Sequence, residues 1–395
     1  MPEVIEWGSG GTPKATVKEY YENGDIPWLI IGDLNNGIVT KSETKITKLG
    51  LDNSSAKMIP PNTLLVAMYG SIGKLGITGI ECCTNQAIAF AKKMHGVTTK
   101  YMFYYMAMMK SKLISKGKGG TQKNISQTVL NSLDVIVPPL EEQHRIVTRI
   151  EELFSQLDSG IETLKKTKEQ LKVYRQAVLK EAFESASSSN SKNLTINDLL
   201  TKKKKGMTTG PFGTMLKKHE HQSSGVPVLG IENIGKDGFV DGNKIFVSEE
   251  KAKELSAFKV DTDDLIISRS GTVGEICIVP PHMKNALLST NLMRISLDYD
   301  VIRADYFMYL FKSKGVVIDQ VKELCKGSTR MFLNQTILKQ IIFPVPTLKI
   351  QAKIIETIES RLSVCDSIEK TIDTALQEAE ALRQSILKQA FEGGL

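Results

Sequence analysis

The sequence has few of the features that mark membrane proteins or disulfide-bonded secreted proteins. No apolar run approaches the roughly 20 residues needed to cross a bilayer, and residues 1–6 are acidic, unlike the start of a signal peptide. Only five of the 395 residues are cysteines, and their spacing fits neither a metal site nor a disulfide framework. We therefore predict reduced thiols, a cytoplasmic location, and two or three domains built from the 41% of hydrophobic residues.

Motifs for catalysis and cofactor binding are also missing. An adenine methyltransferase that flips its target base needs an Asn/Asp-Pro-Pro-aromatic motif, and the Pro-Pro pairs at 60–61, 138–139 and 280–281 do not fit it. Residues 70–74 contain glycines and a lysine but lack the spacing of a phosphate-binding P-loop. His219 and His221 have no third candidate metal ligand beside them. The sequence thus predicts a protein without catalytic residues, metal or cofactor of its own.

The chain contains an internal repeat. Residues 175–184 and 383–392 are identical at seven of ten positions, with an offset of 208. Shorter matches with offsets of 200 to 208 extend the repeat: 27–33 with 227–233, 70–77 with 271–278, Thr84-Asn85 with Thr290-Asn291, 120–123 with 327–330, Gln143 with Gln351, and Asp158 with Asp366. Two similar halves in tandem explain this pattern, and they could present two related surfaces.

The net charge of +7 is unevenly distributed along the chain. Residues 1–140 and 185–348 each carry +5, whereas 141–184 and 349–395 carry −1 and −2. This distribution is typical of two globular modules that each meet a polyanion such as nucleic acid, while the other segments meet each other or protein partners.

The hydrophobic pattern predicts the same order of elements in both halves. Short Val/Ile/Leu runs such as 63–67 and 135–137 indicate strands, with a helix near 100–115. A helical period then covers 141–184, and the Ser-rich segment 185–191 is a linker. The second half repeats this plan with strands between 194 and 346, a helix near 304–314 and a long helix over 349–392.

The last helix has two apolar rows in a 4-3 spacing. One row is Ile358, Cys365, Ile372, Ala379 and Ile386, and the other is Ile368, Ala375 and Leu382. Such a seam requires a partner helix, and we expect the long helix of the first half to pair with it in an antiparallel coiled coil. A coiled coil that merely dimerises is the alternative. The expected seam and partner-facing residues are Ile150, Leu157, Leu164, Leu171, Phe183, Ile358, Ile372, Leu382, Ile386 and Phe391.

These motifs together resemble the specificity subunits of type I restriction-modification enzymes. The resemblance covers nearly the whole chain twice, through Gly10-Gly-Thr-Pro13, Pro27-Trp-Leu29, Gly70-Ser-Ile-Gly73, Thr84-Asn-Gln86, Gly120-Thr-Gln122, and the turn Pro138-Pro-Leu-Glu-Glu-Gln143 before a helix ending in Ala-Phe-Glu184. It implies two α/β (α+β) target recognition domains, each reading one half of a split DNA sequence. It also implies that the helices separate the domains as an antiparallel coiled coil with a pseudo-two-fold repeat.

The resemblance further implies the partners and the cofactors. The expected partners are double-stranded DNA, two methyltransferase subunits and the restriction subunits, with S-adenosylmethionine, Mg and ATP held by those partner subunits only. The implied domain scheme is 1–140 for the first recognition domain, 141–186 for the central spacer helix, 187–347 for the second domain and 348–395 for the C-terminal spacer helix. Two other functions remain open: a coiled-coil adaptor that binds only protein, and a silent or regulatory variant.

One departure from the family pattern lies before the first domain. The second module has a lead-in, residues 193–201, and then the run of four lysines at 202–205, before Gly210. The first module reaches Gly10 after only nine residues. This departure has two explanations: either the first domain lacks a strand or the chain starts late. The lysine run could contact phosphate or form a solvated loop.

DNA-reading side chains are expected in the polar, Gly-flanked loops, where the backbone can approach a duplex closely. The candidates in the first domain are Tyr69, Ser71, Lys74, Asn85, Lys118, Gln122, Lys123 and Asn124; those in the second are Arg269, Ser270, Thr272, Asn291, Arg294, Lys326, Ser328 and Arg330. The alternative for each is a turn residue or a solvated side chain. Differences such as Lys74 against Glu275 predict an asymmetric, bipartite target.

Overall fold

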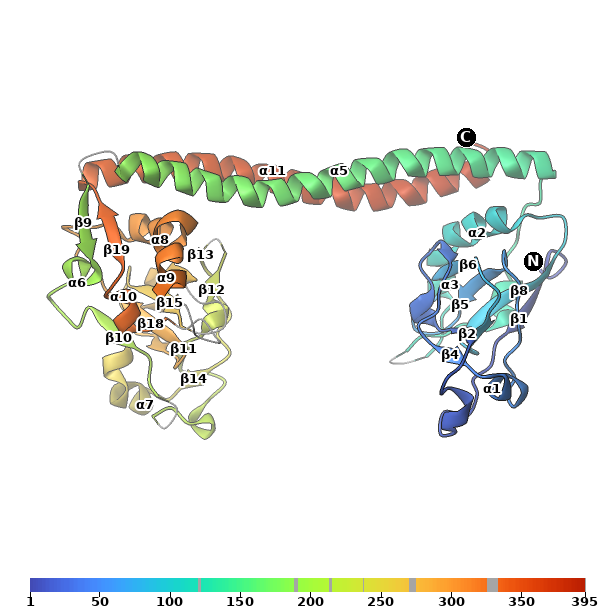
Figure 1. The fold of residues 1–395 in the computed structure, drawn as a ribbon, viewed down its shortest axis with the longest axis horizontal. Coiled ribbons are helices and arrows are strands. Elements are labelled where there is room, and N and C mark those ends of the chain that lie inside the picture. The colour runs from blue at the N-terminus through green and yellow to red at the C-terminus, as the bar shows by residue number, and fades with distance from the viewer. Residues whose placement is uncertain are drawn as a thin grey trace. The chain divides into compact units, whose positions relative to one another are not determined.

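The structure, a computed structural model, describes residues 1–119, 122–187, 191–212, 215–236, 238–269, 275–324 and 333–394 (Figure 1). The chain forms two compact units. Unit 1 comprises Met1–Leu164 and Asp373–Leu395, and unit 2 comprises Lys165–Ile372. Because the unit boundaries fall within the two long helices, α5 (Leu140–Ser187) and α11 (Leu348–Phe391), each unit contains part of both. No helix among the described residues is both long and apolar enough to cross a membrane.

A five-stranded sheet in the order β1-β8-β5-β6-β3 forms the centre of unit 1. Its strands are β1 (Ile5–Ser9), β3 (Ile38–Val39), β5 (Leu64–Ala67), β6 (Leu75–Thr78) and β8 (Ile88–Met94). Alternate side chains of β5 point to opposite faces, so Leu64 and Val66 belong to one core while Leu65 and Ala67 belong to another. The first core also contains Tyr101 of α2 (Thr99–Met108) and Leu387 of α11. The sheet is therefore buried on both faces.

The rest of unit 1 consists of short elements. A second sheet has the order β4-β2-β7. Its strands and the remaining helices are β2 (Ile26–Leu29), β4 (Lys45–Ile46), β7 (Cys83–Thr84), α1 (Lys48–Asp52), α3 (Lys110–Ser115), α4 (Gln127–Asn131), and the 3-10 turns Lys18–Tyr20 and Ile31–Asp33. The helix expected over 100–115 is thus divided into α2 and α3 at Met109.

Unit 2 repeats this plan. Its main sheet has the order β10-β18-β15-β16, formed by β10 (Met207–Thr209), β15 (Leu265–Ser268), β16 (Ile276–Ile278) and β18 (Leu292–Ile295). The sheet β14-β11-β17 matches β4-β2-β7, and it contains β11 (Val226–Leu229), β14 (Phe246–Val247) and β17 (Leu287–Leu288). In both small sheets the first pairing is antiparallel and the second is parallel. The repeat found in the sequence is thus a repeat of topology.

Short elements complete unit 2. They are α6 (Ile196–Leu199), α7 (Glu249–Glu254), α8 (Ala304–Lys312), α9 (Asp319–Leu324), α10 (Gln335–Leu338), the pair β12 (Ile234–Gly235) and β13 (Gly238–Phe239), the π-helical turn Lys314–Ile318, and the 3-10 turns Lys218–Glu220, Ile231–Asn233, Ser256–Phe258 and Pro281–Met283. α8 occupies the place of α2, and the buried rings of Tyr306 and Phe307 anchor it in the core.

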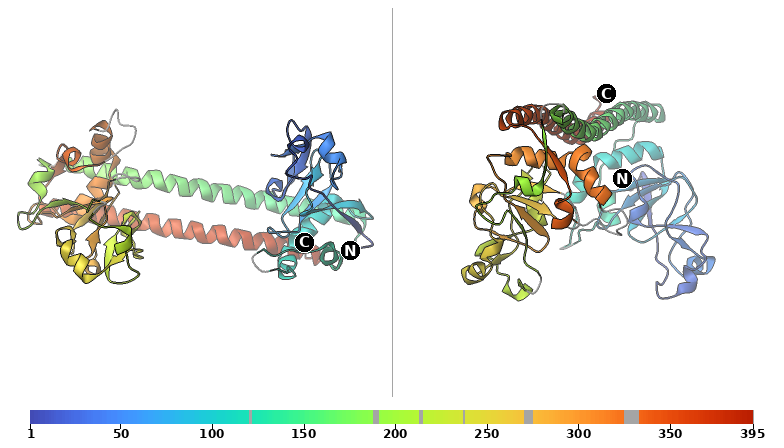
Figure 2. Two further views of the ribbon diagram at one scale, coloured as in Figure 1. Left: turned by 90° about the horizontal axis from the view of Figure 1, so that it is seen from below. Right: turned by 60° about the vertical axis from the view of Figure 1, so that its left-hand side comes forward.

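The long helices run antiparallel within each unit, as their contacts and Figure 2 show. In unit 1, Arg383 of α11 binds Asp158 of α5. In unit 2, Arg175 of α5 binds Asp366 of α11 and, at 3.1 Å, Glu369. These are the repeated Arg and Asp positions of the sequence, so the Arg of each half pairs with the Asp of the other half. The expected antiparallel coiled coil is confirmed.

The seam lies largely where the spacing predicts it. Ile150, Leu171, Phe183, Ile358, Ile372 and Ile386 are buried, Leu157, Leu164 and Phe391 are half-buried, and Leu382 is 50% exposed. The prediction of Leu382 as a seam residue is wrong, because two helices bury only one stripe on each other. The row Ile358 to Ile386 fills that stripe, so Ile368 and Leu382 of the other row face solvent.

The N-terminal part of each long helix is tied to its domain by a glutamine. Gln143 accepts a hydrogen bond from the N–H of Thr98 and donates to the carbonyls of Gly96 and Pro138. Gln351 accepts from the N–H of Arg303 and donates to the carbonyls of Val301 and Pro346 in the same way. Both side chains are fully buried. The repeated glutamine therefore joins the long helix to the domain in both halves.

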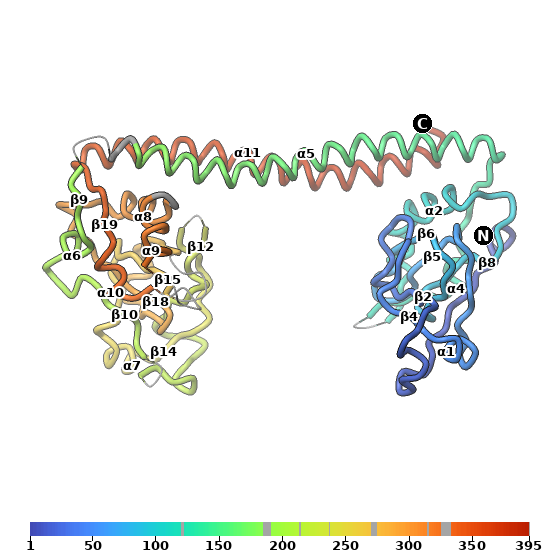
Figure 3. Tube along the Cα trace, in the orientation of Figure 1, coloured from blue at the N-terminus to red at the C-terminus, as the bar shows by residue number. Residues whose placement is uncertain are grey.

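The two units differ at the segment that precedes each long helix. In unit 2, β19 (Ile342–Val345) pairs with β9 (Lys192–Thr195), and these strands lie side by side in Figures 1 and 3. In unit 1 the expected strand over 135–137 is wrong: these residues are not in a strand, because no described segment pairs with them. A run of β-branched residues forms a strand only where a neighbour completes the ladder.

Candidate nucleic-acid interface

Two loops of unit 1 bring most of the predicted contact residues together. A backbone bridge between Tyr69 and Asn124 joins the loop between β5 and β6 to the loop after α3, and a bridge between Lys118 and Asn124 closes the second loop on itself. The N–H of Gly70 donates to the carbonyl of Lys123 over 3.1 Å, and the N–H of Ile125 donates to that of Met68 over 2.9 Å. Backbone hydrogen bonds thus hold the loops together and leave the polar side chains outside.

The side chains at this joint are exposed. The exposed residues are Tyr69, Ser71, Lys118, Gln122, Lys123 and Asn124. Gly70 and Gly73 have φ of +62° and +73°, a conformation that favours glycine, and they shape the tight turn between the two strands. The repeated glycines therefore serve the turn, as the alternative interpretation expects, while the polar residues between and beside them face outward.

A cavity of about 640 Å³ lies between the two loops. It is lined by Asn36, Gly70, Ser71, Ile72, Lys74, Lys110, Ile114, Gln122 and Lys123. Lys74 is anchored there by hydrogen bonds to the carbonyls of Ile31 and Gly32, at 3.1 and 3.3 Å. Lys110 and Lys123 form no ion pair within the described part of the chain. Three ammonium groups around one cavity form a positively charged hollow suited to an anion such as a DNA phosphate.

Two lining residues with polar side chains, Asn36 and Lys110, are not among the residues predicted from the sequence. Asn36 lies in the turn before β3, and Lys110 is the first residue of α3. Neither residue belongs to a repeated motif of the sequence. Only the fold brings them to the Gly70 turn. No signal in the sequence could have found them.

Asn85 is set apart from these loops. Its side-chain oxygen accepts a hydrogen bond from the N–H of Ala87 over 3.1 Å, and its own N–H donates to the carbonyl of Leu29 over 3.0 Å. The half-buried side chain stabilises the turn that leads into β8. This placement matches the alternative interpretation, in which a repeated Asn holds a turn.

The register of the two units corrects one sequence match. Leu29 pairs with Thr84 in unit 1, and Leu229 pairs with Leu288 in unit 2. Thr84-Asn85 therefore corresponds to Leu288-Ser289 rather than to Thr290-Asn291. Thr290-Asn291 follows the structural counterpart of Thr84-Asn85 by two residues. The two Thr-Asn pairs are therefore identical in sequence but not equivalent in the fold. Gln86 accordingly corresponds to Thr290.

In unit 2, Arg269 follows β15 and lies beside Asn291, which corresponds to Ala87 in the turn before the last strand of the main sheet. The N–H of Arg269 donates to the carbonyl of Asn291 over 3.0 Å, and its guanidinium donates to that of Thr290 over 3.2 Å. Leu333 donates to the carbonyl of Arg269, as Ile125 does to Met68, so Arg269 corresponds to Met68. Burial lowers the pKa of Arg269. Ser270, Thr272, Lys326, Ser328 and Arg330 lie outside the described residues.

Arg294 is placed inside unit 2 rather than at its surface. Its guanidinium donates to the carbonyls of Lys259 and Lys205 and to Thr208 Oγ1, and it lies 3.8 Å from buried Asp264. Burial lowers its pKa, and Asp264 opposes that effect. The side chain therefore supports the main sheet and is not directed at a ligand on the surface.

The four-lysine run is partly used inside the protein. Lys204 forms ion pairs with Asp264 and Asp261 at 3.1 and 3.6 Å. All four lysines are exposed, and the backbone carbonyl of Lys205 accepts from Arg294. Lys204 thus has acidic partners, whereas the side chains of Lys202, Lys203 and Lys205 form no ion pair among the described residues.

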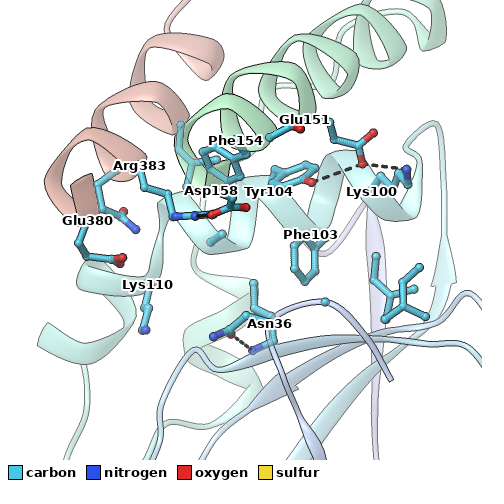
Figure 4. A pocket seen from close by; sticks show the side chains of 18 of the residues that line it. Asn36, Lys100, Phe103, Tyr104, Lys110, Glu151, Phe154, Asp158, Glu380 and Arg383 are labelled. Carbon is cyan, nitrogen blue, oxygen red and sulfur yellow. Dashed lines mark hydrogen bonds and ion pairs between the residues drawn. The ribbon is translucent and has the colours of Figure 1, made fainter. Parts of the chain in front are cut away.

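A second cavity of about 730 Å³ in unit 1 is lined by α2, the two long helices, β6 and the segment around β3 (Figure 4). Lys100 forms an ion pair with Glu151 at 2.8 Å, and the guanidinium of Arg383 lies 4.5 Å from the ring centroid of Phe154.

The repeated phenylalanines of the long helices pack on aromatic rings of the domains. Phe391 of α11 contacts Tyr101 and Tyr105, with ring centroids 5.1 and 5.4 Å away. In unit 2 Phe183 packs on Tyr306 at 5.4 Å. The two repeated phenylalanines thus pack on a domain.

Among the described residues, no group of three or more His, Cys, Asp or Glu side chains could hold a metal ion. Burial raises the pKa of Cys82, Cys83 and Cys277 to about 12, which keeps these thiols protonated and unreactive. Among the described residues, the groups available to bind a ligand at the joined loops are therefore the charged and amide side chains.

Comparison with known proteins assigns the repeat to one family. The family model of the type I restriction modification DNA specificity domain matches residues 2–173 and again 189–378. The EcoKI specificity subunit of Escherichia coli K12 is 23% identical over 95% of this chain and 84% of its own length. The EcoBI specificity subunit of Escherichia coli is 26% identical over 85% of this chain and 74% of its own.

Solved structures share the fold at low identity. A chain from a study of complex assembly and conformational transition of the type I R-M system aligns with a TM-score of 0.73 and 15% identity, covering 100% of this chain and 96% of its own. The HsdS subunit from Thermoanaerobacter tengcongensis aligns with a TM-score of 0.56 and 15% identity, covering 100% and 98%. At such identities the likeness establishes the fold alone.

Proposed function

The chain belongs to the family of type I restriction-modification DNA specificity proteins, and on this premise we propose that it reads an asymmetric, bipartite DNA target with one half-site per unit. It acts without catalysis of its own and directs adenine methyltransferase and restriction subunits to that target. The observation that carries this proposal is a shared scaffold with divergent side chains. The backbone contact of Ile125 with Met68 recurs as that of Leu333 with Arg269, but the side chains differ: Met68 corresponds to Arg269 and Lys74 to Glu275. Different side chains on one scaffold are what two different half-sites require.

The proposed DNA surface of unit 1 is centred on the cavity between the joined loops. The proposed contact residues are Tyr69, Ser71, Lys74, Lys118, Gln122, Lys123 and Asn124 in unit 1, and Arg269 and Asn291 in unit 2, with Ser270, Thr272, Lys326, Ser328 and Arg330 added from the sequence. Lysines supply phosphate contacts that position the duplex, whereas Gln, Asn and Arg offer the planar donors that read base edges. Asn85 is omitted because its half-buried side chain holds the turn before β8, and Arg294 because its side chain is buried inside unit 2.

For the protein partners we propose two methyltransferase subunits, one for each half of the repeat. Exposed apolar side chains on the coiled coil support this: Tyr174 and Leu382 occupy equivalent positions beside Arg175 and Arg383, and they are 44% and 50% exposed. Val173, Val364 and Ile368 extend the apolar surface in unit 2. Such exposed apolar residues typically mark a protein interface. S-adenosylmethionine, Mg and ATP belong to the partner subunits in this scheme, and restriction subunits join the assembly through that core.

The test is to co-express this chain with the methyltransferase subunit encoded beside it and to map modified adenines in host DNA by single-molecule sequencing. We expect a split, asymmetric motif with a nonspecific spacer. A palindromic motif would contradict the one-half-site-per-unit scheme. A stable complex without any motif would identify a silent or regulatory variant, and a chain that binds protein but never DNA would be an adaptor.

A further inference from the structure

One phenylalanine of unit 2 stands in solvent beside the proposed DNA contacts. The Phe212 side chain is 67% exposed, and among the described residues every other Phe or Trp side chain is buried or half-buried. A phenyl ring has no polar atom to bind water, so its exposure forgoes the free energy that burial would give. The surroundings of this ring and its counterpart in unit 1 indicate what it binds.

The backbone holds Phe212 in this position. Before it, the N–H of Gly210 donates to the carbonyl of Leu292 over 3.0 Å. A Cβ on Gly210 would lie 1.9 Å from the carbonyl oxygen of Ser289, so the two segments touch through their backbones, as only glycine permits. After it, the N–H of Met215 donates to the carbonyl of Phe212 over 2.8 Å. The outward position of the ring is therefore set by the fold.

The register of the main sheets shows which residue lies next to Phe212. Counted from the last pair of β10 with β18, Phe212 holds the place that Thr12 holds beside β1 and β8. Thr290 likewise holds the place of Gln86. In unit 1 the hydroxyl of Thr12 donates to the side-chain oxygen of Gln86, so residues at these two places are neighbours on the surface. Phe212 thus lies beside Thr290.

Thr290 belongs to the edge of unit 2 that carries the proposed base contacts. Its carbonyl accepts from the guanidinium of Arg269 over 3.2 Å, and the carbonyl of Asn291 accepts from the N–H of Arg269 over 3.0 Å. Arg and Asn are the side chains that typically read guanine and adenine in the major groove. Phe212 therefore adds an apolar group to a reading edge that is otherwise polar.

The major groove offers one apolar group that such a ring can contact. Guanine, adenine and cytosine present donors and acceptors there, whereas thymine also presents its C5 methyl group. A phenyl ring cannot neutralise a phosphate, and it has no atom that could form a hydrogen bond with a base edge. Contact with the methyl group buries apolar surface on both partners, which is the contribution that this side chain can make.

We propose that Phe212 contacts the C5 methyl group of a thymine and so specifies an A·T pair in the half-site of unit 2, which rests on the proposed function that this unit reads DNA. Unit 1 has no such contact at the equivalent place, because Thr12 carries a polar hydroxyl that binds Gln86. Phe212 is thus a specificity-determining residue for one half of the target.

The experiment uses the full-length chain in complex with its methyltransferase subunit and a fluorescent duplex that carries the mapped target. Each thymine is replaced in turn by deoxyuridine, which removes only the methyl group. At one thymine we expect affinity to fall about fourfold, the effect of burying roughly one methyl group. That thymine should lie in the half of the target that changes when residues 188–347 are exchanged for those of a relative.

Protein variants connect that thymine to the ring. Phe212→Ala should weaken binding of the unsubstituted duplex by at least the same factor, and deoxyuridine at that position should then cause no further loss, because both changes remove one contact. Phe212→Leu retains an apolar side chain and should retain the preference for thymine over deoxyuridine. The matched control is Ile342→Ala, which trims another exposed apolar side chain of unit 2 and should keep the wild-type preference.

The deoxyuridine series on the wild-type chain keeps the test independent of how the variants fold. A loss in Phe212→Ala that is equal for thymine and deoxyuridine at every position would assign the ring to base stacking or to the sugar and would overturn the methyl contact. Unchanged binding by Phe212→Ala would overturn it as well. Failure of the proposed function is distinguishable, because the wild-type complex would then bind target and nontarget DNA equally, and the methyl contact would fall with it.

Discussion

Lys74 and Glu275 illustrate at the scale of one residue how a repeated fold can carry two specificities. Each directly precedes the second strand of the hairpin, and each accepts a backbone hydrogen bond from the first strand, Lys74 from Ala67 and Glu275 from Ser268, both over 2.8 Å. The backbone is therefore the same at both positions while the charge is reversed. A difference in binding at this position therefore comes from the side chain.

Lys74→Glu should weaken DNA binding by the complex with methyltransferase subunits. If Lys74 contacts a phosphate, the loss is similar for target and nontarget DNA, and the salt dependence of log K falls by roughly one. Fluorescence anisotropy at several salt concentrations measures both quantities. Lys57→Glu, an exposed lysine outside the cavity, is the control for net charge. Equal effects of the two variants would remove Lys74 from the interface.

Arg294→Leu should destabilise unit 2 by about 3 kcal/mol, because it takes a cation from the buried carboxylate of Asp264 and leaves the carbonyls of Lys205 and Lys259 without a donor. Urea unfolding of the free chain measures this cost. Arg303→Leu breaks only the exposed pair with Asp305 and should cost less than about 1 kcal/mol. If instead DNA affinity falls while stability is unchanged, Arg294 is a contact residue after all.

At the scale of elements, the repeated phenylalanines join the coiled coil to the domains. Phe183→Ala should destabilise unit 2 by about 4 kcal/mol, since the ring is fully buried against Tyr306. Phe391→Ala should cost about 2 kcal/mol in unit 1, because that ring is partly exposed although it contacts Tyr101 and Tyr105. Hydrogen exchange in α2 and α8 locates each effect. A larger loss for Phe391 would reverse this ranking.

Phe391→Ala also tests the role of the helix tip in assembly. Losing the contact with α2 should free the last turn of α11, so association with methyltransferase subunits should weaken more than the fold of unit 1. Size-exclusion chromatography of the co-expressed subunits gives the result. An intact assembly would show that this tip only stabilises unit 1.

Elements were predictable from sequence where a periodic pattern fixes them, and not where a distant neighbour decides. The seam row from Ile358 to Ile386 follows from a seven-residue spacing alone. The segment 135–137 has the composition of a strand, but strand formation depends on a partner that the sequence pattern does not contain. The register of Thr84 depends on its pairing with Leu29, which no local match reveals. The burial of Arg294 likewise depends on Asp264 across the sheet.

At the scale of the whole molecule, the duplication separates two tasks. Each unit has its own main sheet, its own small sheet and its own buried core, and the coiled coil contributes to both cores through equivalent positions. Loop side chains can therefore diverge in one unit without disturbing the packing of the other. The sequence predicted this organisation because the repeat is retained in buried and backbone-binding residues such as Gln143 and Gln351.

This separation predicts the behaviour of hybrid chains. Replacing residues 1–139 with the corresponding domain of a relative that has a different target should change one half of the methylated motif, because base contacts come from the loops of one unit. The other half of the motif should stay the same. The reciprocal replacement of residues 188–347 should change only that other half. Mapping modified adenines for both hybrids gives the result, and a motif that changes in both halves after a single replacement would show that the units do not read DNA independently.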